Sequence, residues 1–149
     1  MTLSSRILCM RATSSTTVNA PVDHVWNVLS DHEGMSSWAP GLKAVLVSPG
    51  TAERNGVGAV RKIGLGFAGP IKEEIVAFEP GKLLRYKALA GVPLKNYFGE
   101  VELTAVPGGT RIDYSVSVDE RVPGVDRTMA KVISKTLLSA LARRAKATA

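Results

Sequence analysis

The sequence predicts a single α+β domain in which a curved antiparallel sheet surrounds a long C-terminal helix. Three observations lead to this prediction. Apolar residues recur at helical spacing in one segment near the start of the chain and in a long segment at its end. Between them, segments in which apolar and polar residues alternate are separated by turns rich in Pro and Gly. Because short connections join antiparallel neighbours, these segments should form one sheet of about six to seven strands.

The composition fits one globular domain, with 149 residues, 45% of them apolar and 21% charged. No run reaches about 18 apolar residues, so no transmembrane segment is predicted. The single cysteine, Cys9, cannot form an internal disulfide, and this favours a reducing, cytoplasmic location. We expect residues 1–11 to form a disordered N-terminal extension and residues 12–149 to form the domain. Met10 is a second possible start of translation.

The first expected elements are a strand and two helices. Residues 12–19 are rich in Ser, Thr and Val, which favours a strand. Pro21 suits the first position of a helix, where its missing N–H costs nothing. A single apolar stripe follows at helical spacing: Val22, Val25, Trp26 and Leu29. A short helical turn is expected over residues 33–38, and Pro40 prevents its continuation.

The remaining elements are strands and the final helix. The expected strands are 42–48, 59–67, 71–78, 83–89, 96–106 and 110–119. Alternation in the last three predicts one apolar and one polar face, with all three tyrosines on the apolar face. The final helix, about residues 125–144, carries a wide apolar stripe that should face the sheet. This stripe consists of Val125, Met129, Val132, Ile133, Leu137, Ala140 and Leu141.

Four motifs resemble one known superfamily. They are Ala20-Pro21-Val22-Asp23-His24-Val25-Trp26-Asn27-Val28-Leu29-Ser30-Asp31, Trp38-Ala39-Pro40-Gly41, Phe78-Glu79-Pro80-Gly81-Lys82-Leu83-Leu84, and the stretch from Gly99 to Ile112. With the order of elements, they resemble the START-like, or Bet v 1-like (SRPBCC), superfamily with its helix-grip fold. Within it, the chain is similar to the bacterial polyketide cyclase/dehydrase and lipid-transport branch. The resemblance runs from about residue 12 to residue 147.

This resemblance implies a deep cavity between the sheet and the last helix. Members of the family hold lipids, sterols, polyketides or quinones there. The predicted ligand-binding residues are Trp38, Tyr86, Tyr97, Val101, Tyr114, Met129, Ile133 and Leu137. A tyrosine suits such a site because it combines apolar area with one polar group, although each tyrosine fits plain core packing equally well. Trp38 lies in the short helix that closes the pocket mouth in this family.

Evidence for catalysis is weak, and no catalytic residue can be named. His24 should face water, whereas His32 lies in a loop from which it could reach the pocket mouth. Adjacent residues on a strand point to opposite faces, so one of Glu73 and Glu74 should face the cavity. Residues 64–69 match G-x-G-x-x-G, but a strand-like segment follows, which argues against a nucleotide site. No cofactor and no metal are expected.

Three functions remain in competition. The leading one is binding or transport of a hydrophobic small molecule such as a lipid, quinone or polyketide-like compound. The alternative is an enzyme of the polyketide cyclase or aromatase type. The third is an interaction module that uses the basic C-terminal segment. Residues 127–149 contain six basic and no acidic residues, so they hold the whole net charge of +6. Nucleic acid is not expected as a partner, and both a monomer and a homodimer are compatible with the sequence.

Overall fold

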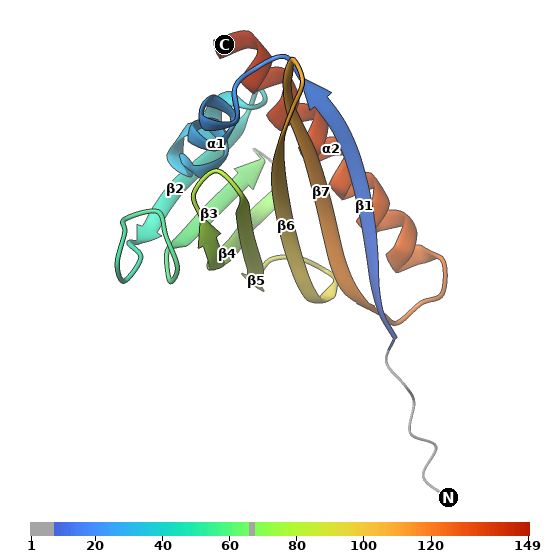
Figure 1. Ribbon diagram of the computed structural model, residues 1–149. Helices are drawn as coiled ribbons and strands as arrows, with labels where there is room; N and C mark the ends of the chain where they lie inside the picture. The colour runs from blue at the N-terminus through green and yellow to red at the C-terminus, as the bar shows by residue number, and fades with distance from the viewer. Residues whose placement is uncertain (1–7, 66–67) are drawn as a thin grey trace, which may run out of the picture.

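The computed structural model describes residues 8–65 and 68–149 and confirms the helix-grip α+β fold. One antiparallel sheet has the strand order β1-β7-β6-β5-β4-β3-β2. The strands are β1 (Leu8–Val18), β2 (Leu42–Ser48), β3 (Val60–Leu65), β4 (Ala68–Glu79), β5 (Leu83–Ala90), β6 (Lys95–Val106) and β7 (Gly109–Glu120). The helices are α1 (Val22–Ser30), the 3₁₀ helix η1 (Glu33–Ser37) and α2 (Val125–Thr148). The sheet arches, and α2 runs along its β1 and β7 side (Figure 1).

Strand β1 starts earlier than the sequence analysis places it. It pairs with β7 over its whole length, from Leu8 opposite Glu120 to Val18 opposite Thr110. Met10 is buried in the core. Residues 8–11 therefore belong to the sheet, which corrects the predicted start of the domain at residue 12. The cause is tertiary, because β7 is long enough to supply partners that the composition of β1 does not reveal. Residues 1–7 lie outside the described residues.

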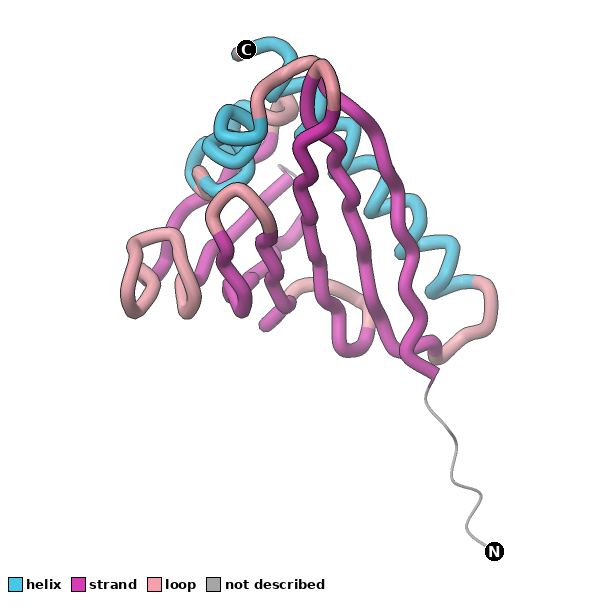
Figure 2. The backbone as a smooth tube through the Cα atoms, in the orientation of Figure 1, coloured by secondary structure: helices cyan, strands magenta, loops and turns pink. Residues whose placement is uncertain are grey.

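Of the other strands, β4 to β7 are joined by short connections, whereas residues 49–59 form a longer loop between β2 and β3 (Figure 2). Their bounds agree with the predicted ones to within three residues. The G-x-G-x-x-G match spans the β3–β4 connection, and both of its flanks are strands. No helix N-terminus follows it that could hold a pyrophosphate. Gly66 and Phe67, in the middle of the match, lie outside the described residues.

Helix α2 packs on the sheet through a face that differs from the predicted stripe. Its buried residues are mostly small: Asp126, Ala130, Ser134, Leu138, Ala140, Leu141 and Ala145. The Ser134 hydroxyl lies 2.9 Å from the Ser14 hydroxyl on β1. In contrast, Val125 is 51% exposed and Val132 is 58% exposed. Small side chains let the helix approach β1 and β7 closely. The contact face is rotated away from Val125, Met129 and Val132, whereas Ala140 and Leu141 of the predicted stripe are buried as expected.

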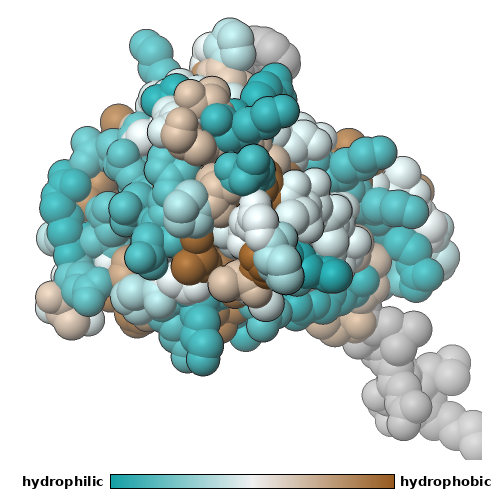
Figure 3. Space-filling view, turned by 45° about the horizontal axis from the view of Figure 1, so that its top comes forward, coloured by the Kyte–Doolittle hydropathy of each residue, from teal (hydrophilic) through white to brown (hydrophobic). Residues whose placement is uncertain are grey.

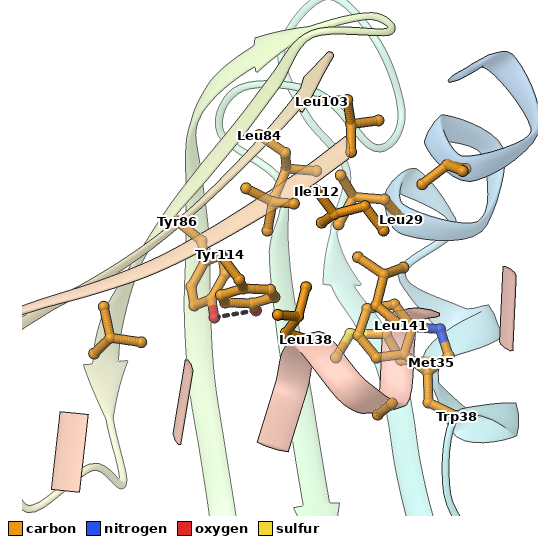
Figure 4. Close-up of a cluster of buried hydrophobic side chains, with 14 of the residues drawn as sticks. Leu29, Met35, Trp38, Leu84, Tyr86, Leu103, Ile112, Tyr114, Leu138 and Leu141 are labelled. Carbon is orange, nitrogen blue, oxygen red and sulfur yellow. Dashed lines mark hydrogen bonds between the residues drawn. The ribbon is translucent and has the colours of Figure 1, made fainter. Parts of the chain in front are cut away.

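A cluster of buried hydrophobic side chains lies where α1, η1 and the C-terminal half of α2 meet the sheet. Figure 4 shows this cluster. Its labelled members include Leu29, Met35, Trp38, Leu84, Leu103, Ile112, Leu138 and Leu141, all of them buried. Polar residues predominate on the outer face in Figure 3, with apolar residues in small separate patches. Within the described ranges, neither α-helix combines the length and apolarity needed to cross a bilayer.

Candidate ligand-binding cavity

A cavity of about 290 Å³ lies between the sheet and α2 and opens on one side to solvent. Its walls come from η1, from β2 to β7, from the β5–β6 connection and from α2. The apolar part of the lining consists of Met35, Leu42, Ile63, Ile71, Gly91, Val92, Pro93, Val132, Ile133 and Leu137. The polar part consists of Arg61, Glu73, Tyr86, Tyr97, Tyr114 and Thr136. The site is thus largely apolar with a few polar groups, the usual character of a small-molecule pocket.

Five of the eight residues predicted to bind a ligand line this cavity. They are Tyr86, Tyr97, Tyr114, Ile133 and Leu137. The other three lie outside the lining. Val101 is fully buried in the core, and Trp38 is buried beside a separate surface hollow next to α1. Met129 is 37% exposed, because the rotation of α2 turns it toward solvent. A contact between any of the eight and a ligand stays a prediction.

The polar end of the cavity is built around an ion pair that the sequence analysis did not identify. Arg61 on β3 lies directly opposite Glu73 on β4 in the sheet register. Nε and Nη2 of Arg61 each lie 2.8 Å from Oε2 of Glu73. Both residues are buried, with 2% and 5% exposure. Removing either residue would leave the charge of the other buried without a partner, which would destabilise the fold.

The guanidinium of Arg61 is held in its charged form. Burial on its own would lower the pKa of Arg61, but the charge of the Glu73 carboxylate raises it above its ordinary value. The guanidinium also lies over the ring of Tyr86, 4.6 Å from the ring centre, in a cation–π contact. The cavity therefore ends at a fixed positive group whose charge is matched by a carboxylate.

His32 completes this buried network. It has no exposed surface; its Nδ1 lies 3.2 Å from Nη1 of Arg61, and its Nε2 lies 2.8 Å from the backbone oxygen of Asn55. Because arginine can only donate, Nδ1 accepts and Nε2 carries the proton. Burial and the charge of Arg61 lower the pKa of His32 to about 4. Both ring nitrogens are engaged and His32 does not line the cavity, so the geometry suits a residue that holds Arg61 in place.

The two other acid–base candidates lie away from the cavity. Glu74 does not line it and pairs with Lys87 at 3.3 Å near the surface. His24, which was expected to face water, is half-buried. Its Nε2 lies 3.0 Å from both the carbonyl oxygen of Ala145 and the hydroxyl of Thr148. His24 therefore joins α1 to the end of α2, which corrects the prediction of a fully solvated side chain.

Three tyrosines bring hydroxyl groups to the polar end. The hydroxyls of Tyr86 and Tyr114 lie 2.6 Å apart and form a hydrogen bond (Figure 4). Tyr97 is adjacent, with its ring centre 6.3 Å from that of Tyr86. Burial raises the pKa of all three phenols, so they stay protonated and can donate hydrogen bonds.

Gly99 on β6 makes room for the Tyr86 ring. It pairs with Tyr86 across the two strands. A Cβ atom at position 99 would lie 2.1 Å from Cζ of Tyr86, closer than atoms can approach. The absence of a side chain at this position therefore fixes where the Tyr86 hydroxyl lies.

The sequence contains a signal that could have revealed the ion pair. Ala59, Arg61 and Ile63 alternate along the strand that the sequence predicts over residues 59–67, and two of these three residues are apolar. A charged residue between two inward-facing apolar residues requires a buried partner. The partner could not be identified from the sequence, because it depends on the register between β3 and β4.

The basic residues of α2 lie away from the cavity. Arg127 and Lys131 border a polar hollow on the β1 side of the helix, and neither lines the ligand cavity. Arg127 also contacts Glu120, with 3.7 Å between Nη2 and Oε2. The third function considered from the sequence, an interaction through this basic helix, would therefore use a different surface from ligand binding.

Comparison with solved structures supports the fold. The crystal structure of Ara h 8.0201 matches with a TM-score of 0.72 at 17% identity, covering 93% of this chain and 98% of that one. A protein from Nitrosospira multiformis also matches with a TM-score of 0.72, at 24% identity, covering 90% and 94%. DynU16, a protein of the dynemicin biosynthetic locus, matches at 23% identity with a TM-score of 0.70, covering 89% of this chain and 46% of that one.

The family assignment comes from the sequence itself. Among curated proteins, no relative matches this chain. The model of the family described as "Polyketide cyclase / dehydrase and lipid transport" matches residues 10–148, which is nearly the entire described domain. Together with the helix-grip architecture and its Bet v 1-like structural neighbours, this match confirms the resemblance carried by the four motifs. The chain belongs to the polyketide cyclase/dehydrase and lipid-transport family of the START-like superfamily.

Proposed function

We propose that this protein binds or carries a hydrophobic small molecule in the cavity between the sheet and α2. The observation that carries the proposal is the cavity of about 290 Å³, whose walls are largely apolar and whose ion pair and tyrosines lie next to one another. Such an arrangement holds a molecule by its apolar surface and orients it by a few hydrogen bonds. The family description and the helix-grip neighbours support the same function. We place this function in the cytoplasm, which suits a chain with a single, exposed cysteine.

The test is ligand retention and ligand-dependent stability. Native mass spectrometry of the purified protein should detect a bound apolar molecule. A ligand present at 100 times its Kd should raise the free energy of unfolding by about 2.7 kcal/mol. If the protein is empty and no apolar compound in a diverse set raises its Tm, the proposal fails.

A matched pair of variants ties binding to this cavity. Ile133→Trp fills the cavity from α2 and should abolish ligand binding. Val125→Trp adds the same side chain on the same helix, at a residue that is 51% exposed and does not line the cavity. It should bind as the parent protein does. Equal binding by both variants would place the ligand elsewhere.

The buried polar network favours a second candidate, an enzyme of the cyclase or aromatase type. Arg61 and the protonated tyrosines could stabilise an enolate oxygen, which such a ring closure requires. Incubation with a linear poly-β-ketone should then give a cyclised product more quickly than the uncatalysed reaction. Tyr97→Phe should lower the rate without abolishing binding. A rate equal to that in buffer would leave binding as the sole function.

A further inference from the structure

The two carboxylate oxygens of Glu73 differ in their hydrogen bonding. Oε2 accepts a hydrogen bond from Nε of Arg61 and also lies 2.8 Å from Nη2. Among the described residues, no hydrogen bond reaches Oε1, although Glu73 is 95% buried and lines the cavity. An occupant that covers this oxygen without donating a hydrogen bond to it would leave a buried acceptor unpaired, which is unfavourable. The polar end therefore presents a strong acceptor to whatever occupies the cavity.

Donors lie beside this acceptor. A guanidinium has five N–H groups, and the contacts of Arg61 with Glu73 and His32 account for three of them. Arg61 and Tyr97 also line the cavity, and burial keeps the Tyr97 phenol protonated. An occupant thus meets a strong acceptor and strong donors at one end of the same cavity.

The net charge at the Arg61–Glu73 end of the cavity determines which polar group of a ligand can bind there. Arg61 and Glu73 cancel, so the site offers no excess positive charge to an anion. A carboxylate ligand would bring a second negative charge next to Glu73 and would lack a proton to donate to Oε1. A hydrocarbon would leave Oε1 unpaired and cover it. A hydroxyl group can donate to Glu73 and accept from Arg61 or Tyr97, so it satisfies both requirements.

The volume sets the size of the molecule. A cavity of about 150 Å³ lined by apolar residues holds one benzene ring. The present cavity of about 290 Å³ has roughly twice that volume, which corresponds to two fused rings.

We propose that the cavity selects a neutral, hydroxylated molecule of about the size of two fused rings over the carboxylate of the same skeleton, with Glu73 as the residue that determines this specificity. The inference rests on the proposed binding function and adds the chemical class of the ligand. It predicts that the hydroxylated molecule binds more tightly than both the hydrocarbon and the carboxylate of the same skeleton. A purely hydrophobic pocket would favour the hydrocarbon, and a pocket that binds anions would favour the carboxylate.

The experiment compares three probes of one skeleton by isothermal titration calorimetry at neutral pH: 2-naphthol, naphthalene and 2-naphthoate. We expect 2-naphthol to bind at least tenfold more tightly than 2-naphthoate and several-fold more tightly than naphthalene. If naphthalene binds and 2-naphthoate binds as tightly as 2-naphthol, the specificity proposal is overturned and the binding function stands. If none of the three binds, both proposals are overturned.

A variant pair tests the role of Glu73. Glu73→Gln keeps the shape of the side chain but leaves the charge of Arg61 unmatched, so the preference should invert and 2-naphthoate should bind at least tenfold more tightly than 2-naphthol. Glu74→Gln is the matched control, because Glu74 is the neighbouring carboxylate and lies outside the cavity. It should keep the preference of the parent protein. An unchanged preference in Glu73→Gln would overturn the assignment.

A second variant covers the case in which Glu73→Gln does not fold. Arg61→Gln combined with Glu73→Gln removes both charges, so no ion is left without its partner. This double variant should bind 2-naphthol and 2-naphthoate with affinities that differ by less than threefold. Retention of the parent's tenfold discrimination by the folded double variant would show that the ion pair does not set the specificity.

Discussion

The interior between the sheet and α2 has two ends, one filled by side chains and one that contains the cavity. At the end next to α1, Leu29, Ile112 and Leu141 are at most 2% exposed and fill the space with aliphatic side chains. At the other end, Arg61 and Glu73 lie beside a hollow of about 290 Å³. Both ends are covered by the same helix and backed by the same sheet.

The difference indicates that one end of the interior stabilises the fold and the other is available to bind a ligand. Strand β7 passes through both regions, with Ile112 in the packed end and Tyr114 at the cavity two residues further on. The packed end can hold α2 on the sheet without help from a ligand. The hollow end is then free to keep polar groups and empty volume, both of which cost folding free energy.

The largest expected effect comes from breaking the ion pair at the hollow end. Arg61→Met leaves Glu73 buried without its partner and should lower the free energy of unfolding by about 3–5 kcal/mol. Arg61→Met combined with Glu73→Leu should recover most of this loss. The control is Arg54→Met, since the Arg54–Glu33 pair is 2.6 Å long but exposed, and its loss should cost less than about 1 kcal/mol. Urea denaturation measures all three, and equal losses for Arg61→Met and Arg54→Met would contradict the prediction.

A cavity made at the packed end should have the next largest effect. Leu141 is fully buried, so Leu141→Ala should cost about 3–4 kcal/mol through lost burial and the space left behind. Val132→Ala, on the same helix at a residue that is 58% exposed, should stay within about 0.5 kcal/mol of the parent. Ligand affinity should change little in Leu141→Ala. A loss of affinity without a loss of stability would mean that the two ends are not separable in this way.

The pH dependence of stability should report on His32. Its pKa in the folded state is lowered to about 4 from an ordinary value of 6.5, so the unfolded chain binds more protons between these values. The free energy of unfolding should therefore have its full value above pH 6.5. It should fall as the pH drops toward 4, by up to about 3 kcal/mol. Denaturation midpoints measured between pH 4 and 7 check this. The dependence should be reduced in His32→Gln and retained in His24→Gln, and the reverse result would refute the assignment.

The smallest effect is expected for the tyrosine pair at the border of the two ends. Tyr114→Phe removes the partner of the Tyr86 hydroxyl and should cost about 1 kcal/mol. In a double-mutant cycle, Tyr86→Phe and Tyr114→Phe together should cost less than the sum of the two single changes, because both remove the same bond. Additive costs would show that the hydrogen bond contributes nothing to stability.

The fold could be predicted from the sequence because its signals are local. Turns such as Glu79-Pro80-Gly81 set the hairpins, and alternation in β6 and β7 set the buried face of the sheet. The same signals failed where partners decide the outcome. Residues 8–11 are held by β7, and the buried face of α2 is set by small residues such as Ala130 and Ser134, which a search for large apolar residues passes over.

The site was only partly predictable for a similar reason. Alternation placed Tyr86, Tyr97 and Tyr114 on the inner face, and all three line the cavity. The same alternation placed Val101 on the inner face. It could not show that the interior is filled by side chains at Val101, whereas a cavity remains elsewhere. Arg61, Glu73 and His32 come from three different elements, and only the tertiary structure brings them together.

Gly99 lies opposite Tyr86 on the neighbouring strand β6 and fixes the position of the Tyr86 ring, because a methyl group there would collide with the phenol. The shape of the chamber can therefore be adjusted at Gly99, without replacing any side chain that lines it. Alanine or serine at position 99 would displace the phenol and change the shape of the chamber. Among homologues, residue size at this position should accordingly vary with guest size even where the lining itself is identical.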